Sequence, residues 1–520
     1  MMFTNLLWLF INPLLSGEFT PIQKEVKKNI TINLSKPKID ILNKVNGFYG
    51  QIGPSPTFYN QSDNYHLFDG NGMIQGVFIN KSTITFQNHW VRTDKFNFEN
   101  IIKSKLPVRM ENFYKNNNFL LYPLFYFLEK LNMYPNMMGT ANTALWKGFI
   151  GKKWKKNNCI DKSNNCIDKS NNCIDKSNNC IDKSNNCIDK SNNCIDKSNN
   201  CIDKSNNEII YALHERDKPY MIDIDFKNTN INTIGKVNID TEYFTAHPRT
   251  FGNSTYICIY NTFKPEVIIY EYDQSFKLKN YKKIKTKYAN MIHDIAVTEN
   301  YIIFIDMPFK FNSNNILKGK NPFLFDSNEK NRIILVNRNL SSNDNDSVQS
   351  IECNETFFIF HFNKFYEINN NIILDTIIHP NFNIDLSDIE YNNIAKYRRI
   401  IIDKNKLTYK IEKKNVFENI NVEFPVSNNK YSVLAILGKG LDINGFIVVK
   451  DFQYIKKKIL INRKIYGELS ITETDCVICF TYDKNLNNYL YIYDIKADKE
   501  VEIKLDVQLI KGFHSIFIKK

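Results

Sequence analysis

The chain has 520 residues, with 68 Lys and Arg against 55 Asp and Glu, and a formal net charge of +13. The positive charge is spread along the sequence, with short runs only at residues 152–156 and 456–458. A nucleic-acid-binding protein would need a clustered basic face or a known module, and the sequence has neither, so no nucleic-acid partner is expected. Basic residues beside apolar ones are compatible with contact to an anionic membrane surface.

The first 17 residues are apolar but lack the basic stretch that begins a secretory signal. At about 15 residues the apolar run is also short for a membrane span. We therefore expect it to remain in the mature protein. The expected location is cytoplasmic or peripheral to a membrane, and organellar targeting stays open.

Short runs rich in Ile, Phe, Tyr and Val dominate the chain and are separated by Asn, Asp and Gly. Several occur in pairs with a few polar residues between them, which is typical of antiparallel meanders. Outside the repeat described below, no linker rich in Pro, Gly or Ser divides the sequence. The pattern predicts one all-β domain over residues 1–520.

Residues 101–138 are the exception, because their apolar residues are too dense for a helix with one buried face. We interpret this segment as an apolar cap. It could be a helix packed across one face of the fold. It could also be a patch that dips into one bilayer leaflet, through which an oily substrate enters.

The heptapeptide CIDKSNN occurs seven times in tandem between Cys159 and Asn207. Its two apolar residues are adjacent, whereas a coiled coil needs them three and four apart. We expect residues 157–207 to be a low-complexity, disordered insertion between two strands of a hairpin, without a catalytic role. Seven of the eleven cysteines lie in this repeat, and the remaining cysteine usage fits a reducing compartment.

Four histidines in different short motifs are candidate ligands of one metal ion: His247, His293, His361 and His514. Imidazole is the commonest protein ligand for a mid-row transition metal. The successive intervals of 46, 68 and 153 residues exclude a local metal clip. They fit blades of a β-propeller, which repeat at about 40–50 residues, with one inward histidine per contributing blade.

The other four histidines, His66, His89, His214 and His379, are interpreted as packed or surface residues. His214 precedes Glu215 in a predicted strand, so the two side chains should point to opposite faces. Cys476 and Cys479 lie in an apolar strand-like run without a second cysteine pair. We expect them to be buried free thiols.

Seven ordered motifs resemble those of the carotenoid cleavage oxygenase family: NPLLSGEFTP, GFYGQIGPSP, YHLFDGNGMIQGVF, HWVRTDKF, GTANTALW, ALHERDKPY and VEFP. The resemblance runs from about Asn12 to the C-terminus. It implies a seven-bladed β-propeller closed around an axial metal site, with a helical or loop cap on one face.

The resemblance also implies a non-haem Fe(2+) cofactor held by His247, His293, His361 and His514. Three glutamates would support these ligands. Glu215 and Glu423 match the family positions, and Glu468 is placed by the order of GE and ETD. Such a carboxylate accepts the second ring N–H of a metal-bound histidine, which fixes its tautomer. Four imidazoles fill four of six octahedral positions and leave two open for O2.

The expected activity is that of a carotenoid oxygenase-like dioxygenase. It would use O2 to cleave a carbon–carbon double bond of a carotenoid, an apocarotenoid or a similar polyene, giving two carbonyl products. Stilbene cleavage, isomerisation of the retinoid type and a non-catalytic propeller that binds a lipid or protein remain alternatives. The expected partners are the polyene, O2 and a membrane surface contacted peripherally, and the protein is expected to be a monomer.

Overall fold

The computed structural model describes residues 22, 24–31, 35–58, 69–80, 83–106, 121–131, 133–136, 139–148, 207–261, 264–311, 323–341, 347–382, 394–438 and 442–520. The apolar N-terminal stretch, His66 and all of the predicted insertion except Asn207 lie outside these residues. Among the described residues, strands dominate and no helix is long and apolar enough to cross a membrane.

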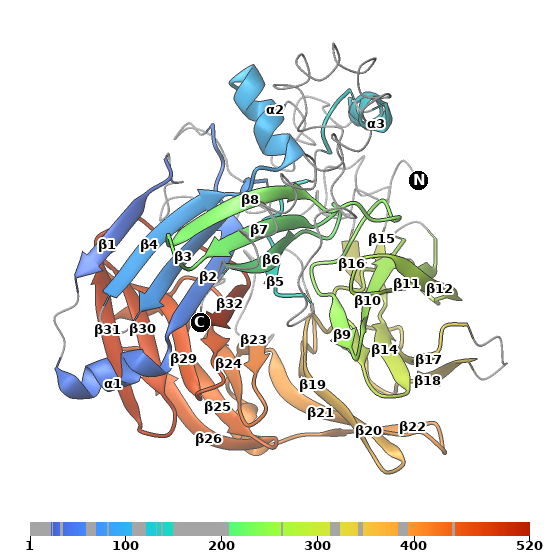
Figure 1. The fold of residues 1–520 in the computed structure, drawn as a ribbon. Helices are drawn as coiled ribbons and strands as arrows, with labels where there is room; N and C mark the ends of the chain where they lie inside the picture. Colours follow the sequence, from blue (N-terminus) through green and yellow to red (C-terminus); the bar gives the residue numbers. More distant parts are fainter. Residues whose placement is uncertain are drawn as a thin grey trace, which may run out of the picture.

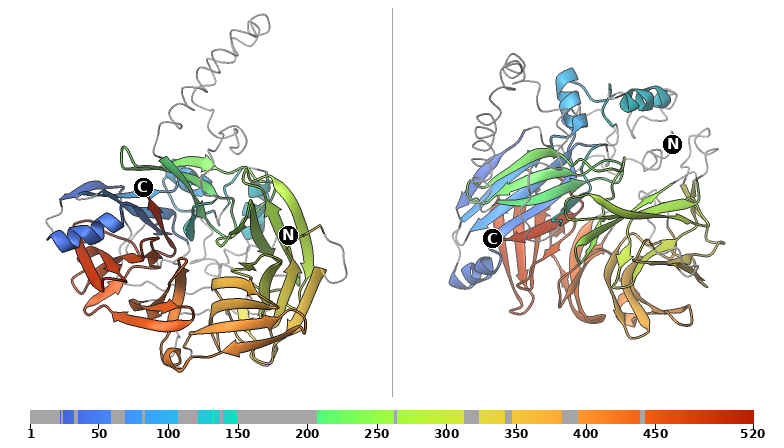
Figure 2. Two further views of the ribbon diagram at one scale, coloured as in Figure 1. Left: turned by 60° about the horizontal axis from the view of Figure 1, so that its bottom comes forward. Right: turned by 45° about the vertical axis from the view of Figure 1, so that its right-hand side comes forward.

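Antiparallel sheets are arranged around a central axis, as Figure 1 shows from one side and Figure 2 from two others. The chain ends close this ring, because the last strand pairs with the second one, Gly47 opposite Lys519. The closing sheet has the order β1 (Lys27–Thr31), β4 (Thr83–Trp90), β3 (Gly72–Asn80), β2 (Gly47–Pro54) and β32 (Ser515–Lys519).

Four sheets of four strands follow in chain order. The first comprises β5 (Ala144–Trp146), β6 (Asn207–Leu213), β7 (Tyr220–Asp225) and β8 (Asn230–Lys236), and the second β9 (Arg249–Phe251), β10 (Ser254–Tyr260), β11 (Glu266–Tyr272) and β12 (Leu278–Lys285). The third comprises β13 (Ala296–Val297), β14 (Tyr301–Asp306), β17 (Arg332–Asn337) and β18 (Val348–Glu352). The fourth comprises β19 (Phe362–Ile368), β20 (Asn371–Ile378), β21 (Lys396–Asp403) and β22 (Thr408–Glu412). A separate hairpin joins β15 (Phe309–Phe311) to β16 (Phe323–Phe325).

The last sheet has nine strands and divides into two parts, which among the described residues are joined only where Ile443 pairs with Ile465. Its strands are β23 (Val422–Ser427), β24 (Ser432–Leu437), β25 (Ile443–Lys450), β26 (Gln453–Ile459), β27 (Arg463–Ile465), β28 (Ser470–Ile471), β29 (Cys476–Asp483), β30 (Asn488–Asp494) and β31 (Lys499–Leu505). The all-β propeller is confirmed. The count of seven blades stays a prediction, because these strands form one sheet.

Strands at the inner ends of the sheets contact one another in the order β9, β13, β19, β23, β28, β32 and β5. Apolar side chains fill the spaces between neighbouring sheets. Ile303 and Leu335, for example, are fully buried in β14 and β17, within a cluster that extends to β10 and β20. Each such side chain contributes about 1.5–3 kcal/mol by its removal from water. The packed ring therefore holds the inner strands at fixed positions around the axis.

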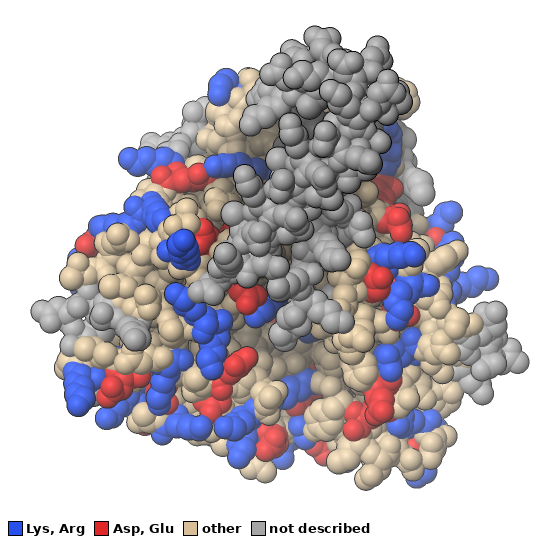
Figure 3. All heavy atoms as spheres, in the orientation of Figure 1, with Lys and Arg blue, Asp and Glu red and all other residues tan. Residues whose placement is uncertain are grey.

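Two outer edge strands are rich in lysine. β12 contains Lys279, Lys282, Lys283 and Lys285, and β26 contains three consecutive lysines. Lysine on an exposed edge opposes pairing with the edge of another molecule. Figure 3 shows basic and acidic side chains interspersed on one face of the molecule. Protection of sheet edges thus explains the lysines of these two strands.

Within the described residues, three short α-helices lie outside the sheets. α1 (Lys36–Lys44) packs against β30 and β31. The N-terminus of α2 (Asp94–Ile102) is capped by Thr93, whose side chain accepts a hydrogen bond from the Phe96 N–H. α3 (Tyr122–Lys130) lies on the same side of the ring as α2 (Figures 1 and 2). A short 3-10 helix spans Asn415–Phe417.

Of the predicted apolar cap at 101–138, the structure describes the end of α2, the helix α3 and residues next to α3. Residues 107–120, 132, 137 and 138 lie outside the described part of the chain. Tyr126 of α3 is buried, whereas Leu124 and Phe127 are 53% and 59% exposed. The segment therefore packs on the ring with one side and presents apolar side chains to solvent with the other.

Candidate metal centre

Each of the four candidate histidines stands just before an inner strand. His247 precedes β9 by two residues, His293 precedes β13 by three, His361 directly precedes β19, and His514 directly precedes β32. The three predicted glutamates also lie at inner strands or beside one: Glu215 follows β6, which pairs with β5, Glu423 is in β23, and Glu468 precedes β28 by two residues. The ring thus brings residues far apart in sequence together at its inner strands.

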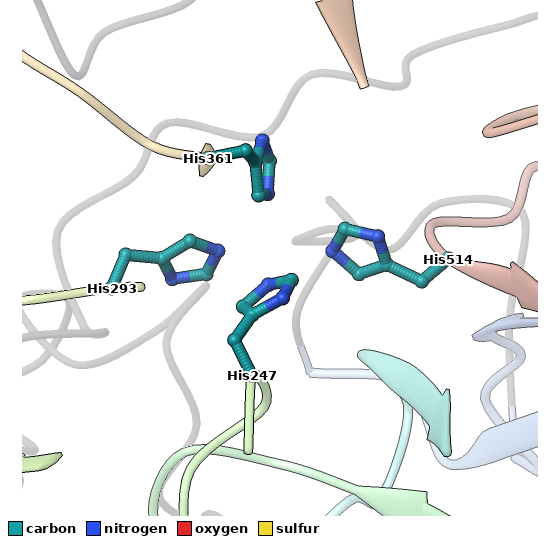
Figure 4. Close-up of side chains that lie close together, drawn as sticks. All are labelled: His247, His293, His361 and His514. Atoms are coloured by element: carbon teal, nitrogen blue, oxygen red, sulfur yellow. The ribbon is translucent and has the colours of Figure 1, made fainter. Parts of the chain in front are cut away.

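The four imidazoles converge on one point (Figure 4). One potential ligand atom from each lies within 4.8 Å of those from the others. The ring of His247 is 4.5 Å from that of His293 and 4.6 Å from that of His514, measured between centroids. His361 completes the group, with its ring 5.1 Å from His293 and 5.2 Å from His514.

The ring nitrogens fit a metal ion. Nε2 of His247 and Nε2 of His361 are buried, and neither has a hydrogen-bond partner among the described residues. A buried polar atom without a partner carries a free-energy cost of about 1–3 kcal/mol, which a bound cation would remove. Four neutral nitrogen donors suit mid-row transition metals.

Three of the four histidines have a carboxylate on the ring nitrogen that faces away from the centre. Nδ1 of His293 contacts Oε1 of Glu215. Nδ1 of His361 lies 2.8 Å from Oε2 of Glu423, and Nδ1 of His514 lies 3.1 Å from Oε1 of Glu468.

This contact fixes Nδ1 as the protonated nitrogen and leaves Nε2 free for a metal. His247 differs from the other three, because within the described part of the chain no carboxylate is paired with its ring. A hydrogen bond from the backbone N–H of His247 to Thr245 Oγ1 holds the main chain at this position.

Burial and neighbouring charges together set the protonation of the centre. Burial, followed by the neighbouring His293, His514 and His361, holds the pKa of His247 well below its usual range. Burial also lowers the pKa of His361, although Glu423 acts in the opposite direction. Burial alone would raise the pKa of Glu423, but His361 and His379 together lower it. Burial alone would lower the pKa of His293, but Glu215 outweighs it and the pKa is raised. The site therefore favours neutral imidazoles at His247 and His361 and an ionised carboxylate at Glu423, which are the forms that metal binding requires.

The second oxygen of each carboxylate has a different partner. Tyr260 donates its hydroxyl to Glu215 Oε2 at 2.7 Å. The Ser515 N–H donates to Glu468 Oε2 at 2.9 Å. Nε2 of His379 lies 3.0 Å from Glu423 Oε1. Sequence reasoning did not find Tyr260 or His379, because neither stands in a motif and both are distant in sequence from the carboxylate they contact.

The other histidines that the structure describes lie outside the cluster. His89 is in β4 and contacts Thr233. His214 is buried, but the prediction that it lies in a strand with Glu215 is wrong, because β6 ends at Leu213. The chain turns there, so strand alternation does not set the direction of either side chain. The four described cysteines, which include Cys476 and Cys479, are buried and free.

Two half-buried aromatic rings stand beside the imidazoles. Phe360 is 5.5 Å from His293 and 5.9 Å from His361, and Phe424 is 5.9 Å from His361 and 6.1 Å from His514, between centroids. Each ring therefore lies next to two neighbouring histidines. The surroundings of the centre are apolar on these sides.

Fold and site together define a β-propeller with a four-histidine centre on its axis. Residues 21–435 match the family described as retinal pigment epithelial membrane protein, and the chain belongs to this family. The resemblance to carotenoid cleavage oxygenases is confirmed by the relatives that the chain matches.

Two plant relatives show the extent of the match. The chain is 25% identical over 382 residues to carotenoid 9,10(9',10')-cleavage dioxygenase 1 of Pisum sativum, covering 72% of this chain and 58% of the relative. It is 22% identical over 558 residues to carotenoid 9,10(9',10')-cleavage dioxygenase of Crocus sativus, covering 97% of this chain and 89% of the relative.

Solved structures share the fold over almost the whole chain. Lignostilbene dioxygenase of Pseudomonas brassicacearum superposes with a TM-score of 0.68 at 14% identity, covering 98% of this chain and 99% of that one. A variant of Synechocystis apocarotenoid oxygenase gives a TM-score of 0.65 at 17% identity, covering 100% and 99%.

Proposed function

We propose that this protein is an Fe(II)-dependent dioxygenase that cleaves a carbon–carbon double bond of a conjugated polyene, such as a carotenoid or apocarotenoid, into two carbonyl compounds. The observation that carries the proposal is the convergence of His247, His293, His361 and His514 on one buried point. The family and the names of the plant relatives support the reaction class.

His247, His293, His361 and His514 would hold the iron through Nε2, with Glu215, Glu423 and Glu468 fixing three of the rings. Bound iron supplies the redox chemistry with O2. Four imidazoles without a carboxylate ligand leave the full double positive charge of Fe(II) uncompensated by its ligands. This donor set differs from the two-histidine, one-carboxylate triad of other non-haem oxygenases.

The protein's own contribution is orientation and exclusion of water. Phe360 and Phe424 would contact the apolar polyene beside the metal and hold one double bond in place. Their rings also keep the surroundings of the centre dry. The proposed cleavage needs no general acid, so the carboxylates are free to serve the histidines.

Peripheral membrane contact is part of the proposal, because polyenes dissolve in membranes. The exposed apolar side chains on and around α2 and α3 support it: Ile101, Leu124, Phe127, Leu131 and Met133 are each at least half exposed. Lys103 at the end of α2 would approach anionic head groups. We propose a monomer that is cytoplasmic or attached to a membrane surface. One similar protein of Arabidopsis thaliana is named as chloroplastic, so an organelle also fits.

The test begins with metal analysis of the purified protein. Protein loaded anaerobically with Fe(II) is then mixed with apocarotenoids, stilbenes and retinyl esters under 18O2, and products are identified by mass spectrometry. Two labelled carbonyl fragments from a polyene are expected. Labelled fragments from stilbenes alone would reassign the substrate, and an isomer formed without O2 would reassign the reaction.

Matched histidine variants assign the activity to the centre. His293→Ala should abolish iron binding and turnover, whereas His89→Ala, which removes a buried histidine outside the cluster, should retain both. Iron-loaded protein that converts no polyene, stilbene or retinyl ester would overturn the proposal and favour a binding role.

A further inference from the structure

We propose that His379 is a positioning residue for the metal ligand His361 and that it acts through the carboxylate of Glu423. This inference rests on the proposed function only in that His361 binds a metal. His379 comes 18 residues after His361 and 44 before Glu423. The fold places the Glu423 carboxylate between the two imidazoles.

The two oxygens of Glu423 are divided between the two histidines. Oε2 lies 2.8 Å from His361 Nδ1, and Oε1 lies 3.0 Å from His379 Nε2. All three side chains are largely buried, with 6% of Glu423 and 12% of His379 exposed. The Phe424 N–H also donates to Oε2, so His361 and Phe424 hold one oxygen and His379 holds the other. The carboxylate bound through both oxygens cannot rotate about its last bond, and His379 supplies the contact that fixes Oε1.

His379 is itself held in place. Its backbone N–H and C=O exchange hydrogen bonds of 2.9 Å with Phe358, three residues before His361. Its ring lies edge-on to those of Phe358, Phe360 and Phe382, at 6.2, 5.6 and 6.0 Å between centroids. The imidazole therefore has a fixed position relative to the segment that carries His361.

No other carboxylate of the centre is held by an imidazole on its far oxygen, within the described residues. Glu215 receives the hydroxyl of Tyr260 and Glu468 receives the N–H of Ser515. Loss of the His379 contact would leave Glu423 Oε1 buried without a donor. The carboxylate would then turn toward other donors, and its hold on the His361 ring would weaken.

The test measures metal binding to the full chain, with Fe(II) under anaerobic conditions and with Co(II) followed by its visible absorption. Changing the carboxylate partner of a metal-bound histidine typically weakens metal binding about 10–100-fold. For His379→Leu, which acts one contact further away, we expect roughly a 3–10-fold loss and altered Co(II) bands. His379→Gln keeps an N–H donor and should restore much of the affinity.

Two comparisons separate positioning from general damage to the fold. His89→Leu removes a histidine of similar burial outside the centre and should leave metal affinity unchanged. Adding His379→Leu to Glu423→Gln should weaken metal binding no further than Glu423→Gln alone, because the two act in series. Melting temperatures of all variants report folding separately from metal binding.

Wild-type affinity and unchanged Co(II) bands in His379→Leu would overturn the inference, as would additive losses in the double variant. If the wild-type protein and His379→Leu bound metal but neither cleaved a polyene, the proposed reaction would fail while the role of His379 stood. If His361→Ala bound metal as well as the wild type, the premise itself would fail.

Discussion

The guanidinium of Arg249 and the carboxylate of Asp294 form a two-point ion pair that joins three of the four histidine-bearing segments. Arg249 Nε lies 2.9 Å from Asp294 Oδ1, and Nη2 contacts Oδ2. The Phe362 N–H donates to Asp294 Oδ2 at 2.9 Å, and Arg249 Nη2 donates to the Phe362 carbonyl at 3.2 Å. Arg249 follows His247 by two residues, Asp294 adjoins His293 and Phe362 adjoins His361. The pair therefore fixes three histidines before any metal binds.

Breaking this pair should be far more damaging than breaking a surface pair. The Asp294 side chain is fully buried, so Asp294→Ala leaves Arg249 without its counter-charge and should cost about 3–5 kcal/mol of unfolding free energy. Lys28→Ala removes an exposed pair with Asp506 and should cost under about 1 kcal/mol. Urea unfolding measures both, and equal losses would contradict the role given to the pair.

Of the three glutamates, Glu468 had the weakest motif support in the sequence. Its contact with His514 predicts that it contributes to metal binding. Glu468→Gln removes the charge and one acceptor oxygen, so Fe(II) affinity should fall about 10–100-fold. Glu502→Gln, which alters an exposed pair with Arg463, is the matched control and should bind iron normally. Anaerobic calorimetry gives both affinities. Unchanged binding in Glu468→Gln would remove Glu468 from the centre.

Acid should lower the free energy of unfolding, partly through protonation of Glu367. Burial alone would raise the pKa of this carboxylate, but hydrogen bonds from Asn300, Lys404 and Thr298 lower it to about 2 from an ordinary 4.5. The unfolded chain therefore binds the proton first as pH falls, so the stabilisation is present above pH 4.5 and is lost as pH falls through 2.

In unfolding titrations the wild type should exceed Glu367→Gln by about 1–2 kcal/mol at neutral pH, after allowance for solvent screening. The difference should disappear near pH 2. A difference that does not change with pH would show that the carboxylate's charge is not its source.

Membrane contact should depend on the exposed side chains of α3. The double variant Leu124→Ser and Phe127→Ser removes apolar surface that would otherwise enter the bilayer, and binding to vesicles containing anionic lipid should fall roughly tenfold. Tyr281→Ser with Ile461→Ser removes similarly exposed apolar side chains outside the cap and serves as control. Flotation with vesicles measures both. Equal binding by the two double variants would argue against α3 as the contact.

Removal of the heptapeptide repeat should leave the fold intact. Trp146 and Tyr211 are paired in adjacent strands, so the repeat lies in the connection between β5 and β6. Replacing residues 159–206 by a few glycines and serines shortens that connection, and loop-closure entropy predicts a gain of about 1 kcal/mol in stability. Iron binding and turnover should not change. Loss of either would give the repeat a function that its composition does not indicate.

Sequence alone predicted the all-β class, because the residue pattern of a strand is local and is set by the strand itself. The propeller was predicted from the intervals between the histidines and from the family resemblance. Sequence reasoning also identified the four histidines that converge, but it chose among eight histidines through motif resemblance, since spacing alone could not exclude His89 or His379. The glutamates were placed by the same resemblance. Strand alternation gave a wrong account of His214, because the strand ends one residue before it.

Only the tertiary structure revealed the contacts behind the centre: Arg249 with Asp294, Tyr260 with Glu215, and His379 with Glu423. These pairs join residues 44 or 45 positions apart on different sheets or on the loops between them. Local periodicity fixes which residues form a strand and which side chains are buried. Which two buried side chains meet depends on the order of the sheets around the axis and on the directions of the chain at the strand ends, and both are set by packing of the closed ring.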